Sequence, residues 1–168
     1  MSTSRTFQAA GVLFTDGADV LAGFQPLKEE PTISGFGGSR EGKETIRETA
    51  FRELLEELFD PEPTFDIKPL IRVLKERYKG DPIVKKSSYR FLILPFCELT
   101  AILALVKAIG FSSQVYTTIP TTIADLIKKR KPLPTSEIST LMLLSRTEVT
   151  ASYGFAIDPY FLEDLQSI

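Results

Sequence analysis

Apolar residues at every fourth position mark the most regular segment of the chain, between residues 46 and 58. The apolar positions are Ile46, Ala50, Leu54 and Leu58, with Phe51 and Leu55 beside them. Because an α-helix turns about 100° per residue, these side chains share one face. The spacing therefore predicts a helix that buries this stripe and begins after a capping residue at Thr45 or Ser39.

Runs of aromatic and branched residues predict strands on both sides of this helix. Thr6–Thr15 and Asp19–Gln25 are separated by Asp16-Gly17-Ala18, which is typical of a hairpin turn. Lys68–Arg77 holds a β-like apolar cluster that is followed by a turn over residues 78–82. Ser87–Cys97 has the strongest strand pattern, and its continuous apolar centre indicates burial on both faces.

The C-terminal half has the pattern of short helices. Thr100–Ile109 and Ile119–Lys131 are predicted helices, and Ile157–Ile168 adds a third, with Asp158 as its cap and Pro159 at its first position. Residues 137–144 fit a strand or a helix. Strands around one helix, followed by further helices, predict a single α/β domain over residues 1–168. We expect a mixed β-sheet covered by helices on both sides.

The polar face of the 46–58 helix carries three carboxylates. Glu53, Glu56 and Glu57 fall within roughly one third of the helix circumference, where each like-charged pair weakens a helix by about a few tenths of a kcal/mol. Carboxylate oxygens are natural ligands of Mg²⁺ and Mn²⁺, so a divalent cation would reverse this repulsion. The face is thus a candidate metal site, with ordinary solvated charges as the alternative interpretation.

The spacing around these glutamates resembles the signature of the Nudix hydrolases. The matching positions are Gly38, Glu44, Arg52, Glu53, Glu56 and Glu57, with Leu54 as the aliphatic residue between the two acidic groups. After one more residue the family has a glycine and an aliphatic residue, where this chain has Phe59 and Asp60. A glycine there commonly supplies a left-handed helix end. We therefore expect the helix to end differently, stopped by Pro61 and Pro63.

The resemblance implies an α/β/α sandwich and a role for each residue of the signature. It implies that Glu56 and Glu57 hold Mg²⁺, and that Glu53 is a third ligand or the group that activates water. Arg52 would orient these glutamates through charge-assisted hydrogen bonds. Glu44 would lie near the metal.

Two candidates lie outside the acidic helix. Gly37, beside Gly38, is a candidate metal ligand, because glycines let the backbone approach a metal or phosphate closely. Glu98 follows the 87–97 strand pattern, and some family members place a catalytic carboxylate in a comparable region. An exposed glutamate at a strand end is the alternative interpretation of Glu98.

The resemblance implies a hydrolase that cleaves a P–O–P bond in a nucleoside diphosphate linked to another group, using water activated by Mg²⁺ or Mn²⁺. A nucleoside triphosphate, a dinucleoside polyphosphate, a sugar nucleotide and a capped RNA all remain open as substrates. Tyr78 loosely resembles an aromatic position of dinucleoside-polyphosphate members, whereas residues 35–38 resemble nucleotide-pool-cleaning members. The alternative function is a non-catalytic Nudix-fold module that binds a nucleotide or RNA.

Composition excludes several other classes. The chain has no histidine, so no Ser-His-Asp system, Cys-His system or histidine-ligated zinc site can be built. The net charge of −2 gives no basic field for nucleic acid, and Lys128–Lys131 is more typical of a solvated helix end.

Cys97 is expected to be buried and fits a reducing compartment. Without a signal-peptide pattern or a bilayer-spanning run of ~20 residues, we expect a soluble cytoplasmic protein, and a homodimer remains open.

Overall fold

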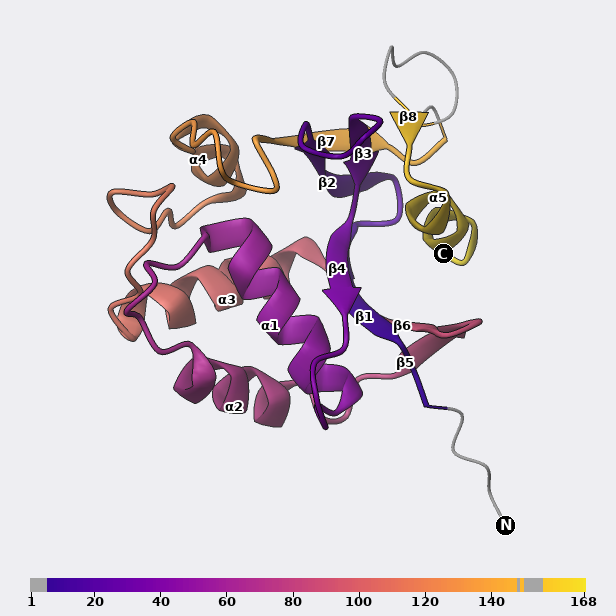
Figure 1. Cartoon of the computed structure of the whole chain (residues 1–168), viewed down its shortest axis with the longest axis horizontal. Helices are drawn as coiled ribbons and strands as arrows, with labels where there is room; N and C mark the ends of the chain where they lie inside the picture. Colours follow the sequence, from indigo (N-terminus) through magenta and orange to yellow (C-terminus); the bar gives the residue numbers. More distant parts are fainter. Residues whose placement is uncertain (1–5, 148, 150–155) are drawn as a thin grey trace.

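Groups of strands are followed by groups of helices in the computed structural model, which describes residues 6–147, 149 and 156–168 (Figure 1). The elements are β1 (Ala9–Phe14), β2 (Asp19–Gln25), β3 (Thr32–Ser34), β4 (Phe36–Ser39), α1 (Ile46–Phe59), α2 (Lys68–Arg77), β5 (Ile83–Lys86), β6 (Tyr89–Leu94), α3 (Phe96–Ala108), α4 (Ile123–Lys128), β7 (Thr140–Ser145), β8 (Ala156–Ile157) and α5 (Pro159–Gln166). The predicted α/β class is confirmed.

The strands form two mixed sheets. The first has the order β4-β1-β6-β5, with β1 parallel to β6 and the other pairs antiparallel. The second has the order β7-β2-β3-β8, in which only β3 and β8 run parallel. The predicted mixture of parallel and antiparallel strand pairs is confirmed, but the strands are divided between two sheets.

The turn after β1 is built as the sequence indicates. Asp16 Oδ1 accepts hydrogen bonds from the backbone N–H groups of Ala18 and Asp19, and Gly17 has a φ of 95°. The predicted hairpin is nevertheless wrong, because β1 and β2 enter different sheets, joined by a bridge between Thr15 and Val20. A turn signal fixes the reversal of the chain, and long-range packing decides which sheet the second strand joins.

The first sheet separates two apolar cores. On β1, Val12 and Phe14 face the core shared with α1, α2 and α3, whereas Leu13 faces the core that contains Phe161 and Leu165 of α5. This alternation follows from the two-residue period of a strand. Helices therefore cover both faces, as Figure 1 shows with α1–α3 on one side of β4 and α5 on the other.

Lys68–Arg77 forms helix α2, so the predicted β-like cluster is wrong. Leu70 and Leu74, one helical turn apart, are buried there, and α2 packs against α1. Pro69 stands in the first turn, where its missing N–H costs no hydrogen bond. The four-residue spacing of the two leucines was the signal that outweighed strand composition.

The strand predicted over Ser87–Cys97 is shorter in the structure. It is β6, which ends at Leu94 because Pro95 is the N-cap of α3. Its burial on both faces is confirmed, since Leu92 and Phe91 belong to different cores. Cys97 lies in α3 and is exposed, contrary to the expected burial.

The remaining helix predictions hold with changed boundaries. The predicted Thr100–Ile109 helix is part of the longer α3, and α4 occupies only part of Ile119–Lys131. Asp158 caps α5 and Pro159 is its first residue, as predicted. Residues 137–144, whose pattern fits a strand or a helix, overlap strand β7.

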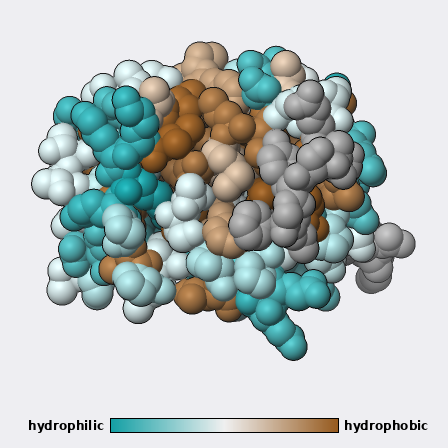
Figure 2. All heavy atoms as spheres, turned by 90° about the horizontal axis from the view of Figure 1, so that it is seen from above, coloured by the Kyte–Doolittle hydropathy of each residue, from teal (hydrophilic) through white to brown (hydrophobic). Residues whose placement is uncertain are grey.

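Two surface properties bear on location and assembly. None of the helices in the described residues is both long and apolar enough to cross a bilayer. The face seen in Figure 2 is apolar across its middle and polar toward one side. A homodimer and a cytoplasmic location remain predictions.

Candidate functional site

Helix α1 presents the three glutamates on a firmly seated support. Thr45 is its N-cap, accepting a hydrogen bond from the Glu48 N–H, and the Glu48 carboxylate accepts one from the Thr45 N–H. This capping box satisfies two N–H groups of the first turn and confirms Thr45 over Ser39. The apolar stripe predicted from the sequence packs on β1 and β4. The acidic stripe borders this packed face, because Glu57 and Glu53 lie against Gly37 and Gly38 of β4.

Arg52 is the centre of the site and is only 7% exposed. Its Nε donates to Glu44 over 2.8 Å, and its Nη1 donates to Glu53 over 2.7 Å and to Glu56 over 3.2 Å. Its Nη2 donates to the Ser39 carbonyl oxygen over 2.8 Å. One buried guanidinium thus joins three of the predicted carboxylates to strand β4.

Charge balance around Arg52 follows from these bonds. Burial alone would lower the pKa of Arg52, but hydrogen bonds to Glu44 and Glu53 outweigh it, so the pKa is raised. Burial alone would raise the pKa of Glu44. The hydrogen bonds from Arg52 and from the Glu41 N–H outweigh this effect, so the pKa of Glu44 is lowered. Both groups are charged at neutral pH, and Glu44 acts on the other glutamates through Arg52.

Glu57 is the most deeply buried carboxylate of the stripe, with 4% exposure. Its Oε1 accepts a hydrogen bond from the Gly37 N–H over 2.7 Å, and its Oε2 accepts a long one from Gln25 Nε2 over 3.4 Å. Burial raises its pKa well above the ordinary value, and the negative charge of Glu53 adds to this. Gly37 lies beside the acidic stripe with its N–H directed at Glu57, and its role as a metal ligand remains a prediction.

Gly38 makes room for Glu53. A Cβ on Gly38 would lie 2.5 Å from Glu53 Cδ, closer than non-bonded atoms approach. The Glu53 side chain is 14% exposed, and burial raises its pKa against the opposing effect of Arg52. The glycine is therefore required by the position of the carboxylate above β4.

Glu56 is the most accessible of the three glutamates, with 43% side-chain exposure. Burial still raises its pKa, while Arg52 opposes the change. Within residues 6–147, 149 and 156–168, no three acidic groups converge as a preformed cation cage. Instead Arg52 Nη1 holds one oxygen each of Glu53 and Glu56.

Glu137 is a further carboxylate of the site, and the sequence reasoning missed it. Its negative charge contributes to the raised pKa of Glu53 and of Glu57, and it lines a hollow of about 310 Å³ with Glu56 and Glu57. Glu137 lies in the loop before β7, 80 positions after Glu57 in the sequence. Its only local signal is an acidic side chain before a strand, which predicts nothing about its neighbours.

Glu98 is not brought to this stripe. It lies in the first turn of α3, where it accepts hydrogen bonds from the Tyr78 hydroxyl over 2.6 Å and from Arg77 Nη2 over 3.3 Å. The bond from Tyr78 is the main cause of its lowered pKa. Tyr78 is itself buried, with its ring 5.6 Å from that of Phe51. These contacts give Glu98 and Tyr78 a structural role in joining α2 to α3.

The end of α1 differs from the predicted proline stop. Phe59 is the last helical residue, and Asp60 takes the left-handed conformation with a φ of 45°. The Phe59 ring is fully buried, with its centroid 5.5 Å from that of Phe111 and 6.2 Å from that of Tyr116. The left-handed residue therefore lies one position after the family's glycine, and Phe59 supplies core packing.

No family model matches the chain, and no curated protein matches it. Among solved structures it is similar to a NUDIX hydrolase from Nitrosomonas europaea, with 18% identity, 96% of this chain and 86% of that chain covered, and a TM-score of 0.45. A NUDIX-family hydrolase from Clostridium perfringens has 12% identity, coverages of 96% and 94%, and a TM-score of 0.42. The E. coli ORF135 protein has 13% identity, coverages of 99% and 93%, and a TM-score of 0.41. Two of these three structures are named as Nudix hydrolases, the family whose signature this chain resembles from Gly38 to Glu57.

Proposed function

We propose that this protein is a Mg²⁺-dependent pyrophosphohydrolase of the Nudix type. It cleaves a P–O–P bond in a nucleoside diphosphate linked to another group. The observation that carries this proposal is the buried Arg52, which gathers Glu44, Glu53 and Glu56 beside the desolvated Glu57. So many carboxylates around one cation leave an excess of negative charge, which a divalent cation would balance.

The residues fit Mg²⁺, or alternatively Mn²⁺, by their chemistry. Glu53, Glu56 and Glu57 would hold it, because both ions prefer carboxylate oxygens. No described residue donates a hydrogen bond to Glu53 Oε2 or Glu56 Oε1, which leaves these two oxygens for a cation. A bound Mg²⁺ supplies positive charge to the diphosphate and lowers the pKa of water.

The chain's own residues position the reaction. Gly37 and Gln25 hold Glu57 in place, and Arg52 fixes the direction of Glu53. If Glu53 is not itself a metal ligand, it accepts the proton of the attacking water, and burial, which raises the pKa of this carboxylate, favours that proton uptake. The water oxygen bonds to one phosphorus, the bridging P–O bond breaks, and the bridging oxygen leaves with the second phosphorylated product.

The test is product release from a panel of P–O–P compounds with Mg²⁺. The panel contains nucleoside triphosphates, sugar nucleotides, dinucleoside polyphosphates and capped RNA. Glu56→Gln should lower turnover of the active class by ~10²-fold or more, since it removes a ligand charge from an accessible side chain. Glu76→Gln, at an exposed glutamate of α2, is the matched control and should retain activity. Absence of turnover for every compound would refute hydrolysis.

The alternative function is a Nudix-fold module that binds a nucleotide or capped RNA without cleaving it. Thermal unfolding with and without Mg²⁺ separates the two. The proposed enzyme should gain melting temperature from Mg²⁺ by mass action, and Glu56→Gln should abolish the gain. A protein that binds a nucleotide, shows no turnover and gains no melting temperature from Mg²⁺ would favour the binding module.

A further inference from the structure

Arg90 on β6 is a buried cation that no carboxylate neutralises. It is 6% exposed, and it forms no ion pair with a described residue. A charge that is taken out of water needs compensating partners, either an opposite charge or a full set of hydrogen bonds. The partners of Arg90 therefore decide whether the protein satisfies this charge by itself.

Backbone carbonyl groups satisfy only one of the three guanidinium nitrogens. Nη1 donates to the carbonyl oxygen of Ser87 over 2.7 Å and to that of Tyr89 over 3.0 Å. Nε and Nη2 donate to none of the described residues. These two nitrogens are the flat pair of donors that binds two oxygens of an anion at once. The bonds from Nη1 thus fix the guanidinium and leave this pair of donors free.

A hollow of about 360 Å³ opens beside Arg90 at the turn between β5 and β6. Its described lining consists of Thr6, Ser87, Ser88 and Arg90, none of which is acidic. The three hydroxyl groups form no hydrogen bond with a described residue. Guanidinium and hydroxyl groups are donors that proteins use for phosphate oxygens. We call this the Arg90 hollow.

The backbone holds the two walls of the Arg90 hollow together. Ser87 has a φ of 53°, which closes the turn, and the Ser88 carbonyl oxygen accepts a hydrogen bond from the Gln8 N–H over 2.9 Å. This bond joins the turn to the segment that carries Thr6. The donors are therefore gathered from two segments before any ligand binds.

Lys85 adds a second positive charge on the same face of the sheet. It lies directly opposite Arg90 in the antiparallel pair of β5 and β6, and opposite residues share a face. Lys85 is exposed and forms no ion pair with the described residues. Like charges directly opposite each other destabilise a sheet, and a bound anion would reverse this effect.

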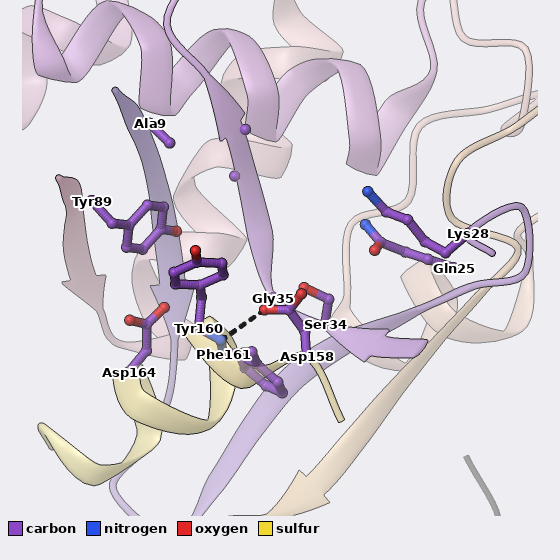
Figure 3. A pocket seen from close by; sticks show the side chains of 12 residues that line it. Ala9, Gln25, Lys28, Ser34, Gly35, Tyr89, Asp158, Tyr160, Phe161 and Asp164 are labelled. Carbon is purple, nitrogen blue, oxygen red and sulfur yellow. Dashed lines mark hydrogen bonds between the residues drawn. The ribbon is translucent and has the colours of Figure 1, made fainter. Parts of the chain in front are cut away.

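The Arg90 hollow is separate from the carboxylate site. Successive residues of a strand point to opposite faces, so the side chains of Tyr89 and Arg90 diverge. Figure 3 shows Tyr89 at the cavity that Asp164 of α5 also lines, and Arg90 lies on the other face of the sheet. The Arg90 hollow shares no lining residue with the hollow beside Glu56 and Glu57. Hydrolysis as proposed makes no use of Arg90.

We propose that the Arg90 hollow binds a phosphate group, either as inorganic phosphate or as the phosphomonoester of a small molecule. Nε and Nη2 of Arg90 bind two of its oxygens, and the hydroxyl groups donate to the others. A carboxylate has only two oxygens and would leave the hydroxyl donors unused. The volume falls within the roughly 300–1,000 Å³ of small-molecule sites, so it also admits a substituent on the phosphate. This assignment is independent of the proposed hydrolysis.

The test is calorimetric titration of the whole protein with sodium phosphate, at constant ionic strength and without divalent metal. Phosphate should bind saturably and about tenfold or more tighter than acetate. Arg90→Lys keeps the charge but loses the pair of donors, so it should weaken phosphate by about tenfold or more. Arg72→Lys, on the exposed face of α2, is the matched control and should leave the affinity unchanged. Absence of saturable binding, acetate binding as tightly as phosphate, or native affinity in Arg90→Lys would overturn the proposal.

Two milder variants keep the test decisive if Arg90→Lys does not fold. Lys85→Gln removes an exposed charge and Ser88→Ala removes one hydroxyl donor, so each should weaken phosphate by about two- to fivefold. Lys107→Gln, at an exposed position of α3, is the control. Native affinity in both Lys85→Gln and Ser88→Ala would refute the site.

A second titration, with adenosine 5′-monophosphate, identifies the source of the phosphate group. Tighter binding than that of inorganic phosphate, weakened by Lys85→Gln, would assign the site to a phosphomonoester. Equal or weaker binding that Lys85→Gln also reduces would assign it to inorganic phosphate. Binding of both ligands that is unaffected by Lys85→Gln and by Arg90→Lys would lie elsewhere and would refute the proposal.

Discussion

Arg130 Nη2 donates a hydrogen bond over 3.0 Å to the backbone carbonyl oxygen of Glu57, which lies 73 positions earlier in the chain. Its Nη1 donates to the Leu58 carbonyl oxygen over 2.6 Å. Helix α1 has no basic residue in its own last turn, so Arg130 supplies the positive charge that favours a helix C-terminus. One member of the basic run predicted to be solvated therefore supports the helix that carries the glutamates.

Arg130→Met should destabilise the protein by about 2–4 kcal/mol, because it leaves carbonyl groups at the end of α1 without a charged donor. Urea unfolding followed by circular dichroism measures the change. Lys131→Met is the matched control, since Lys131 is exposed and should change stability by less than about 0.5 kcal/mol. Equal effects of the two substitutions would show that Arg130 has no special role.

Gly38→Ala should lower hydrolysis by about 10- to 100-fold while the protein stays folded, because the added Cβ displaces the Glu53 carboxylate. Turnover of the best substrate from the panel, together with the melting temperature, separates the two effects. Gly80→Ala is the control, since a Cβ there meets no atom within 4 Å. Full activity in Gly38→Ala would mean that the position of Glu53 is not critical.

Arg52→Lys should reduce both activity and stability, although it preserves the charge. A lysine cannot reproduce the planar set of bonds to Glu44, Glu53 and Glu56. We expect a loss of about 2–4 kcal/mol in the free energy of unfolding, as for other broken buried charge networks. Arg72→Lys on the exposed face of α2 is the control. A stable Arg52→Lys variant with native turnover would contradict the central role of Arg52.

The stability of the native protein should depend on pH through Asp164. Its pKa is about 7 in the folded protein, through burial and the charges of Asp158 and Glu163 against Lys86, and about 3.9 in an unfolded chain. The folded state therefore holds this proton more tightly, so its stabilising contribution is complete below about pH 4 and is lost as the pH rises through about 7.

We expect the free energy of unfolding of the native protein, relative to Asp164→Asn, to fall by about 1–3 kcal/mol between about pH 5 and about pH 8, after discounting for solvent screening. Urea unfolding of both proteins across this range measures the difference, which removes the contribution of the other carboxylates. A difference that stays constant or rises with pH would refute the assigned shift.

The sequence was sufficient to predict what depends on neighbouring positions. The four-residue period located α1, and the fixed spacing from Gly38 to Glu57 identified the acidic stripe before its geometry was known. The Asp158-Pro159 pair located the start of α5. Each of these signals is contained in a short segment, whose local geometry the residues themselves determine.

The contacts that complete the site could not be predicted in this way. Glu137 and Arg130 reach α1 from the C-terminal half. Their partners are set by how the sheets and helices pack, which a pattern within one segment does not specify. Glu98 shows the converse, because its place in the sequence suggested chemistry and its contacts are structural.

Phe59, where the family has a glycine, fixes the end of α1 in a way that bears on the motions of the site. The segment that follows α3 surrounds this end: the Ser113 hydroxyl donates to the Phe59 carbonyl oxygen, and Gln114 Nε2 donates to Asp60 Oδ1 over 3.1 Å. A helix anchored at its last turn by distant residues does not fray there. Its final amides should therefore exchange with deuterium as slowly as those of the core, so that the glutamates rearrange as side chains on a rigid support.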